Sequence, residues 1–394
     1  MYLPNYKNGS VVNLMSSIEK SFGCFPQYQG LDILNSYKLE KSKNVVLIVI
    51  DGLGYEYLIK NGKSSILYKH LKKKITSVFP STTASCIPTF ATGVAPSQHA
   101  LTGWFMYLKE TGMAATIINF TSRSGEMPLY KHGIRIKNIF NQKTIFEKIK
   151  ANSYAIQHQN YIDSEFNNAI IKAEHKLPYS DLSGFFRQIK KAITCNQNRK
   201  YIYAYWHYFD SVCHKYGVAS KQALKHFKQI DKEFSNFLNI INGTGATVIV
   251  TADHGLIDYG KAEMIELDKH PELADTLIIP LCGEPRVAYC YVNPFKIKQF
   301  ENYVKNNLSK YCKAHKSEDL VKKGYFGLFA TNEKLFDRIG NYALIMKENY
   351  VIIDFVLGEE ERRNKKKIVE GSYRGAHGGT SKEEMFVPLI VVNK

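Results

Sequence analysis

Short runs of β-branched residues alternate along this chain with longer segments whose apolar residues recur every three or four positions. The run Asn44–Ile50 is apolar after its first residue, which is typical of a central parallel strand that is buried on both faces. Ala246–Val250 and Phe386–Val392 share this core character. The alternation of strands and helices predicts an α/β fold with a central, mostly parallel sheet flanked by helices.

Weaker patterns complete the predicted sheet and its helices. The segment Ser220–Asn242 repeats apolar residues at helical spacing, and Asp181 is a suitable N-cap for a helix that runs to about Thr194. The other expected elements are a helix over Thr144–Lys150 and strands over Ala114–Phe120, Tyr154–Gln157 and Tyr201–Tyr208.

Between about residues 258 and 374 the predicted elements become shorter and more polar. They include strands over Arg286–Val292 and Tyr350–Val356 and a helix over Pro294–Leu308. We therefore expect residues 1–394 to form a single domain, with a smaller cap or insertion over about residues 258–374.

The segment 77–104, SVFPSTTASCIPTFATGVAPSQHALTGW, predicts a helix with hydroxyl groups at its start. Ser81 is a good N-cap because its hydroxyl can accept a hydrogen bond from a first-turn N–H group. Thr82 and Thr83 would then lie at the positive end of the helix, where an alkoxide is stabilised and a phosphate is attracted. Gly93 is suited to end the helix. The alternative is a buried helix whose hydroxyls bond only its own backbone.

Composition narrows the class of protein. The chain has 394 residues, of which 44% are hydrophobic and 23% charged, and this describes an ordinary soluble globular protein. No apolar run is long enough to span a bilayer. The N-terminus has no basic or apolar signal region, and the seven cysteines include no CxxC pair. These features predict a cytoplasmic protein with reduced thiols, although export by a route that needs no signal would leave the same sequence.

The formal net charge is +17. A basic balance suits an anionic partner such as a phosphate ester, a nucleotide or a nucleic acid. The alternative is compositional bias, because Lys, Asn, Ile and Tyr are abundant together. We expect the two sharpest clusters, Lys72–Lys74 and Arg362–Lys367, to be solvated faces or loops rather than binding sites.

Three of the predicted strands run into an aspartate, namely Asp51, Asp210 and Asp253. The carboxyl ends of parallel strands form one edge of a sheet, where ligands bind, so we expect these carboxylates to lie close together. His214 follows Asp210 by four positions, the spacing that places two side chains on one face of a helical turn.

Two more histidines accompany these carboxylates. His254 directly follows Asp253, and Gly255 permits the sharp turn that would let both side chains reach one ion. His377 lies in the glycine-rich stretch GAHGG before the last strand. Each residue alone has a simple structural explanation as a helix cap, a turn or an exposed loop. Together they predict a metal site, and the mixed carboxylate and imidazole ligands suit Zn²⁺, with Mn²⁺ as the alternative.

These motifs also carry a family resemblance. The stretches VVLIVIDGLG, FPSTTASCIPTFATGVAPSQHALTGW, DSVCHKYG, TADHG and GAHGG occur in the order found in the alkaline phosphatase superfamily. From about residue 44 to its end, the chain resembles the nucleotide pyrophosphatase/phosphodiesterase branch of that superfamily. The resemblance implies an alkaline-phosphatase-like catalytic domain with two zinc ions.

The resemblance also divides the ligands into two sets. One zinc ion would be held by Asp210, His214 and His377. The other would be held by Asp51, Asp253 and His254.

Thr83 matches the nucleophile of the family, with Thr82 as the alternative. Phosphodiesterases of this branch usually carry an Asn after the Pro-x-x-His motif, where it helps to hold a phosphate oxygen. Here Trp104 stands at that position, so the contact would come from its indole N–H or from elsewhere, for example the backbone N–H of Thr83.

The implied reaction is hydrolysis of a phosphodiester or nucleotide pyrophosphate in two steps, through a phospho-threonine at Thr83. No Arg occurs between Tyr68 and Arg123, and this favours a diester because phosphatases of the superfamily that prefer monoesters often use an added cationic group. The alternatives within the superfamily are a phosphomonoesterase and a phosphonate hydrolase. The non-enzymatic alternative is a metal-stabilised basic module that binds nucleic acid.

Overall fold

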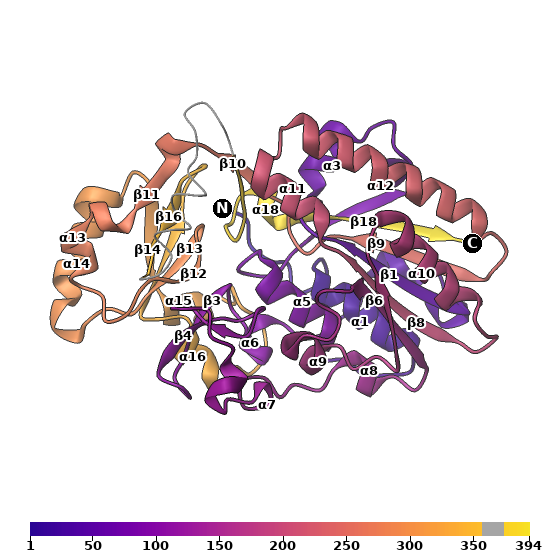
Figure 1. Cartoon of the computed structure of the whole chain (residues 1–394), viewed down its shortest axis with the longest axis horizontal. Helices are drawn as coiled ribbons and strands as arrows, with labels where there is room; N and C mark the ends of the chain where they lie inside the picture. The colour runs from indigo at the N-terminus through magenta and orange to yellow at the C-terminus, as the bar shows by residue number, and fades with distance from the viewer. Residues whose placement is uncertain (357–373) are drawn as a thin grey trace.

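A computed structural model describes residues 1–356 and 374–394 of the chain, in which two seven-stranded sheets lie side by side along the long axis (Figure 1). The main sheet has the strand order β2-β18-β9-β1-β8-β6-β7. Its strands are β1 (Asn44–Ile50), β2 (Leu71–Thr76), β6 (Asn152–His158), β7 (His175–Tyr179), β8 (Lys200–Trp206), β9 (Ala246–Thr251) and β18 (Phe386–Asn393). The neighbours from β9 to β7 run parallel and β18 runs antiparallel, which confirms the mostly parallel sheet.

The centre of this sheet is β1, and all seven of its residues are buried. Val46 pairs with Ile202 of β8 on one side and with Val248 of β9 on the other. A strand with helices on both faces and strands at both edges has no solvated side, which explains its unbroken apolar sequence.

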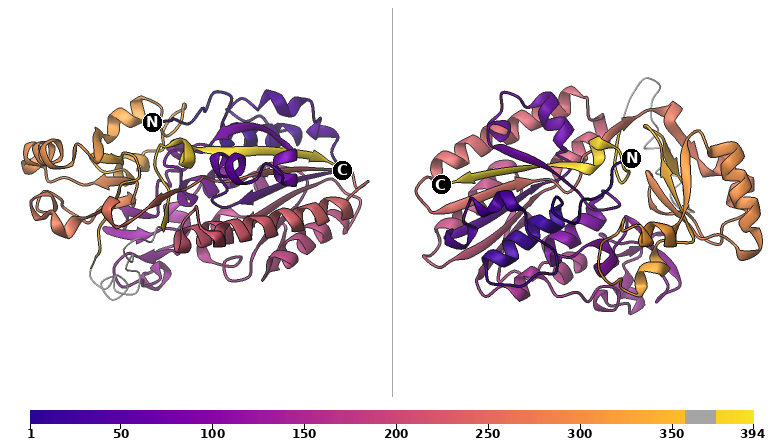
Figure 2. Two further views of the ribbon diagram at one scale, coloured as in Figure 1. Left: turned by 90° about the horizontal axis from the view of Figure 1, so that it is seen from above. Right: turned by 180° about the vertical axis from the view of Figure 1, so that it is seen from behind.

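Helices cover both faces of the main sheet, with α1 (Val11–Ser21) and α12 (Lys221–Ile240) on opposite faces (Figure 2). Next to them pack α5 (Thr83–Thr92) and α10 (Leu182–Thr194), and their apolar faces join one hydrophobic core. The helices expected from Asp181 and Ser220 are thus confirmed as α10 and α12.

The second sheet is antiparallel and has the order β14-β15-β13-β12-β3-β4-β5. Its strands are β3 (Phe105–Leu108), β4 (Met113–Thr116), β5 (Thr121–Ser122), β12 (Cys282–Glu284), β13 (Val287–Cys290), β14 (Cys312–Lys316) and β15 (Tyr342–Met346). Residues 105–122 therefore join this sheet although they lie outside the range 258–374 expected for the cap. The strand expected over Ala114–Phe120 ends at Thr116, because Phe120 adopts a left-handed conformation in the turn that follows.

The remaining elements are short. The helices are α2 (Asp32–Asn35), α3 (Tyr55–Asn61), α4 (Ile66–Lys69), α6 (Pro96–His99), α7 (Ile136–Ile139), α8 (Ile145–Lys148), α9 (Glu165–Ile170), α11 (Tyr208–Tyr216), α13 (Pro271–Ala274), α14 (Ile297–Tyr303), α15 (Ser317–Lys322), α16 (Lys334–Arg338) and α18 (Lys382–Met385). Two strand pairs, β10 (Ile257–Tyr259) with β17 (Arg374–Ala376) and β11 (Met264–Glu266) with β16 (Val351–Ile353), lie outside the two large sheets.

The surface lysines, the cysteines and the chain ends can be placed on this fold. Lys72–Lys74 are exposed on β2, an edge strand of the main sheet, whereas the cluster Arg362–Lys367 lies outside the described residues. The seven cysteines are free, and none of the helices within the described ranges is both long and apolar enough to cross a bilayer. The backbone N–H of Tyr2 donates to the carbonyl of Thr380, whereas the C-terminus lies at the far end of the main sheet (Figure 1).

A buried ion pair joins the second sheet to α18, the short helix that follows β17. Arg286, between β12 and β13, donates through Nε and Nη2 to the two carboxylate oxygens of Glu384 at 3.0 and 2.9 Å. Arg286 is 1% exposed and Glu384 is fully buried. Burial opposes ionisation of Glu384, but the adjacent guanidinium holds its pKa below the ordinary value. The N–H of Gly379 also donates to Glu384, so this carboxylate fixes the loop.

We expect Glu384→Ala to lower the free energy of unfolding by about 3–5 kcal/mol, because it leaves the Arg286 guanidinium buried without its partner. Equilibrium denaturation in urea measures the loss. The control is Asp337→Ala, which removes the exposed pair with Lys109 and should cost less than about 1 kcal/mol. Equal losses in the two variants would contradict the role given to the buried pair.

Candidate active site

The carboxyl edge of β9, β1 and β8 brings the predicted ligands together. Asp51 directly follows β1, Asp253 and His254 follow β9, and α11 after β8 carries Asp210 and His214. The sixth residue, His377, follows β17. Parallel neighbours end at the same edge, so residues some 200 positions apart along the chain become neighbours in space.

Two glycines allow the loops after β1 and β9 to touch. A Cβ atom on Gly54 would lie 2.8 Å from the Cα of Gly255, and a Cβ atom on Gly255 would lie 2.0 Å from the carbonyl oxygen of Glu383. Gly255 therefore serves close backbone approach, and its φ is not in the left-handed region. The left-handed residue is Gly52, whose N–H donates to Asp253 Oδ1 at 3.1 Å.

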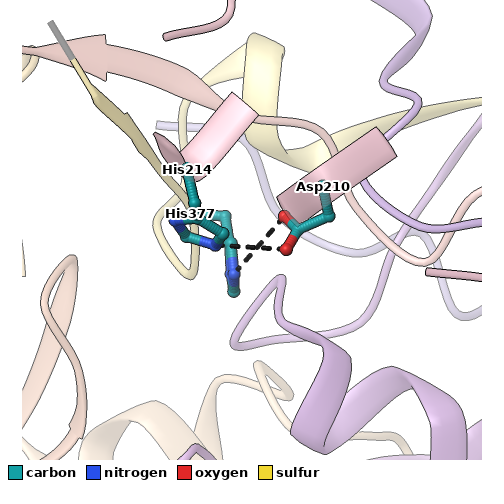
Figure 3. Close-up of side chains that lie close together, drawn as sticks. All are labelled: Asp210, His214 and His377. Carbon is teal, nitrogen blue, oxygen red and sulfur yellow. Dashed lines mark ion pairs between the residues drawn. The ribbon is translucent and has the colours of Figure 1, made fainter. Parts of the chain in front are cut away.

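Asp210, His214 and His377 form the first cluster (Figure 3). Asp210 Oδ2 lies 3.3 Å from His214 Nε2, and Asp210 Oδ1 lies 3.9 Å from His377 Nε2. The other ring nitrogen of His214 lies 2.8 Å from the carbonyl of Gly375, which orients the imidazole so that Nε2 faces the carboxylate.

Asp51, Asp253 and His254 form the second cluster. His254 Nε2 lies 3.4 Å from Asp51 Oδ1 and 3.6 Å from Asp253 Oδ2, and all three side chains are buried. The rings of His254 and His377 stack at 3.8 Å, so the two clusters are contiguous. Asp210 is also close enough to share an ion with Asp51 and His254.

Without cations this concentration of carboxylates is unfavourable. Burial, and then the carboxylates of Asp253 and Asp210, raise the pKa of Asp51 well above the ordinary value. Burial also opposes ionisation of Asp210, but the neighbouring His214 and His377 hold its pKa low. Buried atoms without a hydrogen-bond partner include Asp210 Oδ1 and Asp253 Oδ2. Buried, unpaired carboxylate oxygens beside imidazoles fit divalent cations.

The nucleophile expected at Thr83 lies at the start of α5 and points at the second cluster. Its Oγ1 lies 3.1 Å from His254 Nε2 and 3.5 Å from Asp51 Oδ1. Thr83 is the first residue of the helix and Gly93 ends it, as predicted. The N-cap, however, is Thr82 and not Ser81, because the hydroxyl of Ser81 donates instead to the carbonyl of Gly379, 2.8 Å away.

Sequence reasoning missed two side chains of the site. The hydroxyl of Tyr205, on β8, donates to Asp51 Oδ2. Glu284, at the end of β12, accepts from Thr82 Oγ1 at 2.6 Å and from the backbone N–H of Trp104 at 2.7 Å. Burial raises the pKa of Glu284 to about 7. Neither residue lies in a motif, so only the paired strands and the docking of the second sheet could reveal them.

Trp104 is half-buried and precedes β3. Its backbone, through Glu284, is linked to the residue that precedes the nucleophile. The role of its indole as a substrate contact stays a prediction.

Comparison with protein families identifies the family of this chain. The profile of the type I phosphodiesterase / nucleotide pyrophosphatase family matches residues 45–379. The chain belongs to this family. The match includes Thr83 and all six predicted ligands. No sequence among curated proteins matches the chain.

Solved structures share the fold. Human ectonucleotide pyrophosphatase/phosphodiesterase 5 is 17% identical, with a TM-score of 0.66 over 88% of this chain and 87% of its own. The murine protein, as an inactive threonine-to-alanine variant in complex with AMP, is 17% identical, with a TM-score of 0.65 over the same shares. Phosphonoacetate hydrolase from Sinorhizobium meliloti 1021, in complex with phosphonoformate, is 18% identical, with a TM-score of 0.65 over 89% of this chain and 90% of its own.

Membership of this family makes the chain a phosphoric ester hydrolase of the alkaline phosphatase superfamily. The family is metal-dependent, and two groups of side chains, Asp210 with His214 and His377, and Asp51 with Asp210 and His254, supply candidate ligands for the metal. Small phosphate esters are the substrates that fit the family.

We expect Asp51→Asn to stabilise the metal-free protein. The pKa of Asp51 is raised in the folded state, so the folded protein binds this proton more tightly than the unfolded chain and loses stability as the pH rises above the unfolded value. In chelator at pH 8, the variant should melt about 1–3 °C higher than the unsubstituted protein. The difference should shrink toward pH 4, and added zinc should reverse it, since the variant lacks one of the predicted ligands. A lower melting temperature in chelator at pH 8 would refute the electrostatic account.

Proposed function

We propose that this protein hydrolyses phosphodiesters or nucleotide pyrophosphates in two steps through a phospho-threonine at Thr83, with two zinc ions. The observation that carries the proposal is the position of Thr83 Oγ1, 3.1 Å from His254 Nε2 and 3.5 Å from Asp51 Oδ1. A metal ion held by that cluster would favour ionisation of a hydroxyl at this distance, and the resulting alkoxide could attack phosphorus. The inactive murine relative, in which a threonine is replaced by alanine, supports the same role for Thr83.

The two clusters divide the proposed ligands. Asp210, His214 and His377 would hold one ion, and Asp51, Asp253 and His254 the other. Bound there, two divalent cations would stabilise the ionised threonine oxygen and the charge that develops on the leaving oxygen.

Residues around the site position Thr83 and the second cluster relative to each other. The Gly54–Gly255 contact and the Tyr205 hydroxyl fix the second cluster beside Thr83, and the first turn of α5 directs its positive end toward the same point. In the first step the Thr83 oxygen forms a bond to phosphorus, the bond to the leaving oxygen breaks, and the hydroxyl proton passes through solvent to the leaving oxygen. In the second step water attacks phosphorus, and the bond to Thr83 breaks and regenerates the hydroxyl.

A phosphonate substrate is the second candidate. The observation that favours it is the likeness to phosphonoacetate hydrolase, which is as close in TM-score as the likeness to the murine phosphodiesterase.

Side-by-side hydrolysis of an aryl phosphodiester, an aryl phosphomonoester and phosphonoacetate tests the proposal. Each substrate is assayed with chelator and with added zinc. We expect chelator-sensitive hydrolysis with the highest kcat/KM on the diester. Preference for the monoester or for phosphonoacetate would replace the proposal with the corresponding activity, and generic DNA binding without hydrolysis would favour the binding module.

We expect Thr83→Ala to lower kcat by at least about 1,000-fold, because the nucleophile is removed. Thr82→Ser is the matched control, since it keeps the hydroxyl that donates to Glu284. Turnover is measured on the aryl diester, and zinc content and circular dichroism show whether the site and the fold persist. Activity retained in Thr83→Ala would move the nucleophile to Thr82 or to water.

A further inference from the structure

Glu284 connects the second sheet to both sides of the reaction centre. Its Oε1 accepts from Thr82, which precedes the nucleophile, and from the backbone of Trp104. Its aliphatic stem packs on Gly378, which follows His377, so closely that a Cβ on Gly378 would lie 2.7 Å from Glu284 Cβ. Glu284 is 6% exposed. The carboxylate is thus built into the wall between Thr83 and the first cluster.

No lysine or arginine in the described part of the chain pairs with this carboxylate. Among the described residues, Glu284 makes these two hydrogen bonds and no ion pair with a lysine or arginine. The nearest arginine along the chain, Arg286, is committed to Glu384 through two charged hydrogen bonds. The electrostatic neighbours of Glu284 include His214 and Asp210 of the first cluster. Its charge therefore acts on the space where a phosphoryl group would lie.

We infer that Glu284 is a specificity-determining residue that disfavours dianionic phosphomonoesters relative to monoanionic phosphodiesters. A fixed negative charge repels a dianion about twice as strongly as a monoanion at the same place. The inference rests on the proposed function, because it assigns a substrate preference to that site. The negative charge of Glu284 thus acts in the opposite direction to the positive charge of an added arginine, which would favour the monoester.

The test compares kcat/KM for an aryl phosphomonoester and an aryl phosphodiester in Glu284→Gln at pH 9 with zinc. Glutamine keeps an Oε1 acceptor for Thr82 and Trp104 but removes the charge. At an effective dielectric constant of about 20 and a separation of about 10 Å, loss of one unit charge should raise the monoester-to-diester ratio about tenfold. An unchanged ratio would overturn the inference, even if both rates fall.

Two further variants separate charge from position. Glu284→Asp keeps the charge but shortens the side chain, so both rates should fall while the ratio stays within about twofold. Glu301→Gln removes a charge from α14, on the far side of the second sheet, and should leave the ratio unchanged (Figure 1). A tenfold rise of the monoester-to-diester ratio in Glu284→Asp would attribute the effect to geometry. The same rise in Glu301→Gln would attribute it to overall charge.

Binding measurements decide the matter without turnover. Calorimetry on the Thr83→Ala background compares inorganic phosphate, a dianion at pH 9, with dimethyl phosphate, a monoanion. Adding Glu284→Gln should raise the affinity for inorganic phosphate about tenfold relative to the affinity for dimethyl phosphate. Equal changes for the two anions would refute the role of Glu284. Absence of turnover of both esters in the unsubstituted protein would instead reject the proposed function and leave this comparison to decide the role of Glu284.

Discussion

The structure depends on a concentration of buried negative charge at one edge of a parallel sheet. Asp51, Asp210 and Asp253 meet there because β1, β8 and β9 are parallel neighbours. Carboxylates that share a buried place repel one another, and imidazoles and one tyrosine hydroxyl offset only part of that repulsion. The polypeptide tolerates this arrangement because the apolar sheet beneath it is extensive. The site is therefore poised to bind cations, and binding them completes the electrostatic balance.

Much of the main sheet, and the convergence of the candidate ligands at its carboxyl edge, could be predicted from the sequence. The run before Asp51 and the helical repeat after Ser220 each follow a single period, and local patterns of that kind survive into the fold. The candidate ligands could be grouped from the sequence because the carboxyl ends of parallel strands converge at one edge of a sheet. The N-cap was misplaced by one residue, because the Ser81 hydroxyl is used by a segment almost 300 positions away.

The second sheet was harder to predict from the sequence, for a physical reason. Its strands are short, and residues 105–122 pair with β12 only through a contact between Phe105 and Gly283, far apart along the chain. The periodicity of neither segment indicates that it pairs with the other. For the same reason Glu284 and Arg286 could not be recognised from the sequence, although Glu284 bonds Thr82, next to Thr83, and Arg286 holds Glu384, which fixes the loop that carries His377.

This division of labour makes the second sheet part of the active site. The main sheet and its helices supply most of the candidate ligands and Thr83, while Glu284 bonds Thr82 and Arg286 bonds Glu384. A cap that only covered a site could be exchanged freely. One that supplies buried charged contacts to both the nucleophile turn and a ligand loop is constrained in sequence at those contacts.

The position of the chain ends has a practical meaning for handling the protein. Tyr2 bonds the carbonyl of Thr380 and packs on Phe386 at 5.0 Å, three and nine positions after His377. Any peptide fused in front of Met1 would emerge beside the ligand loop and bring its own side chains there. A polyhistidine tag at that end would place competing imidazoles within reach of the metal site. The opposite end of the chain, remote from the clusters, is the safer point for attachment (Figure 1).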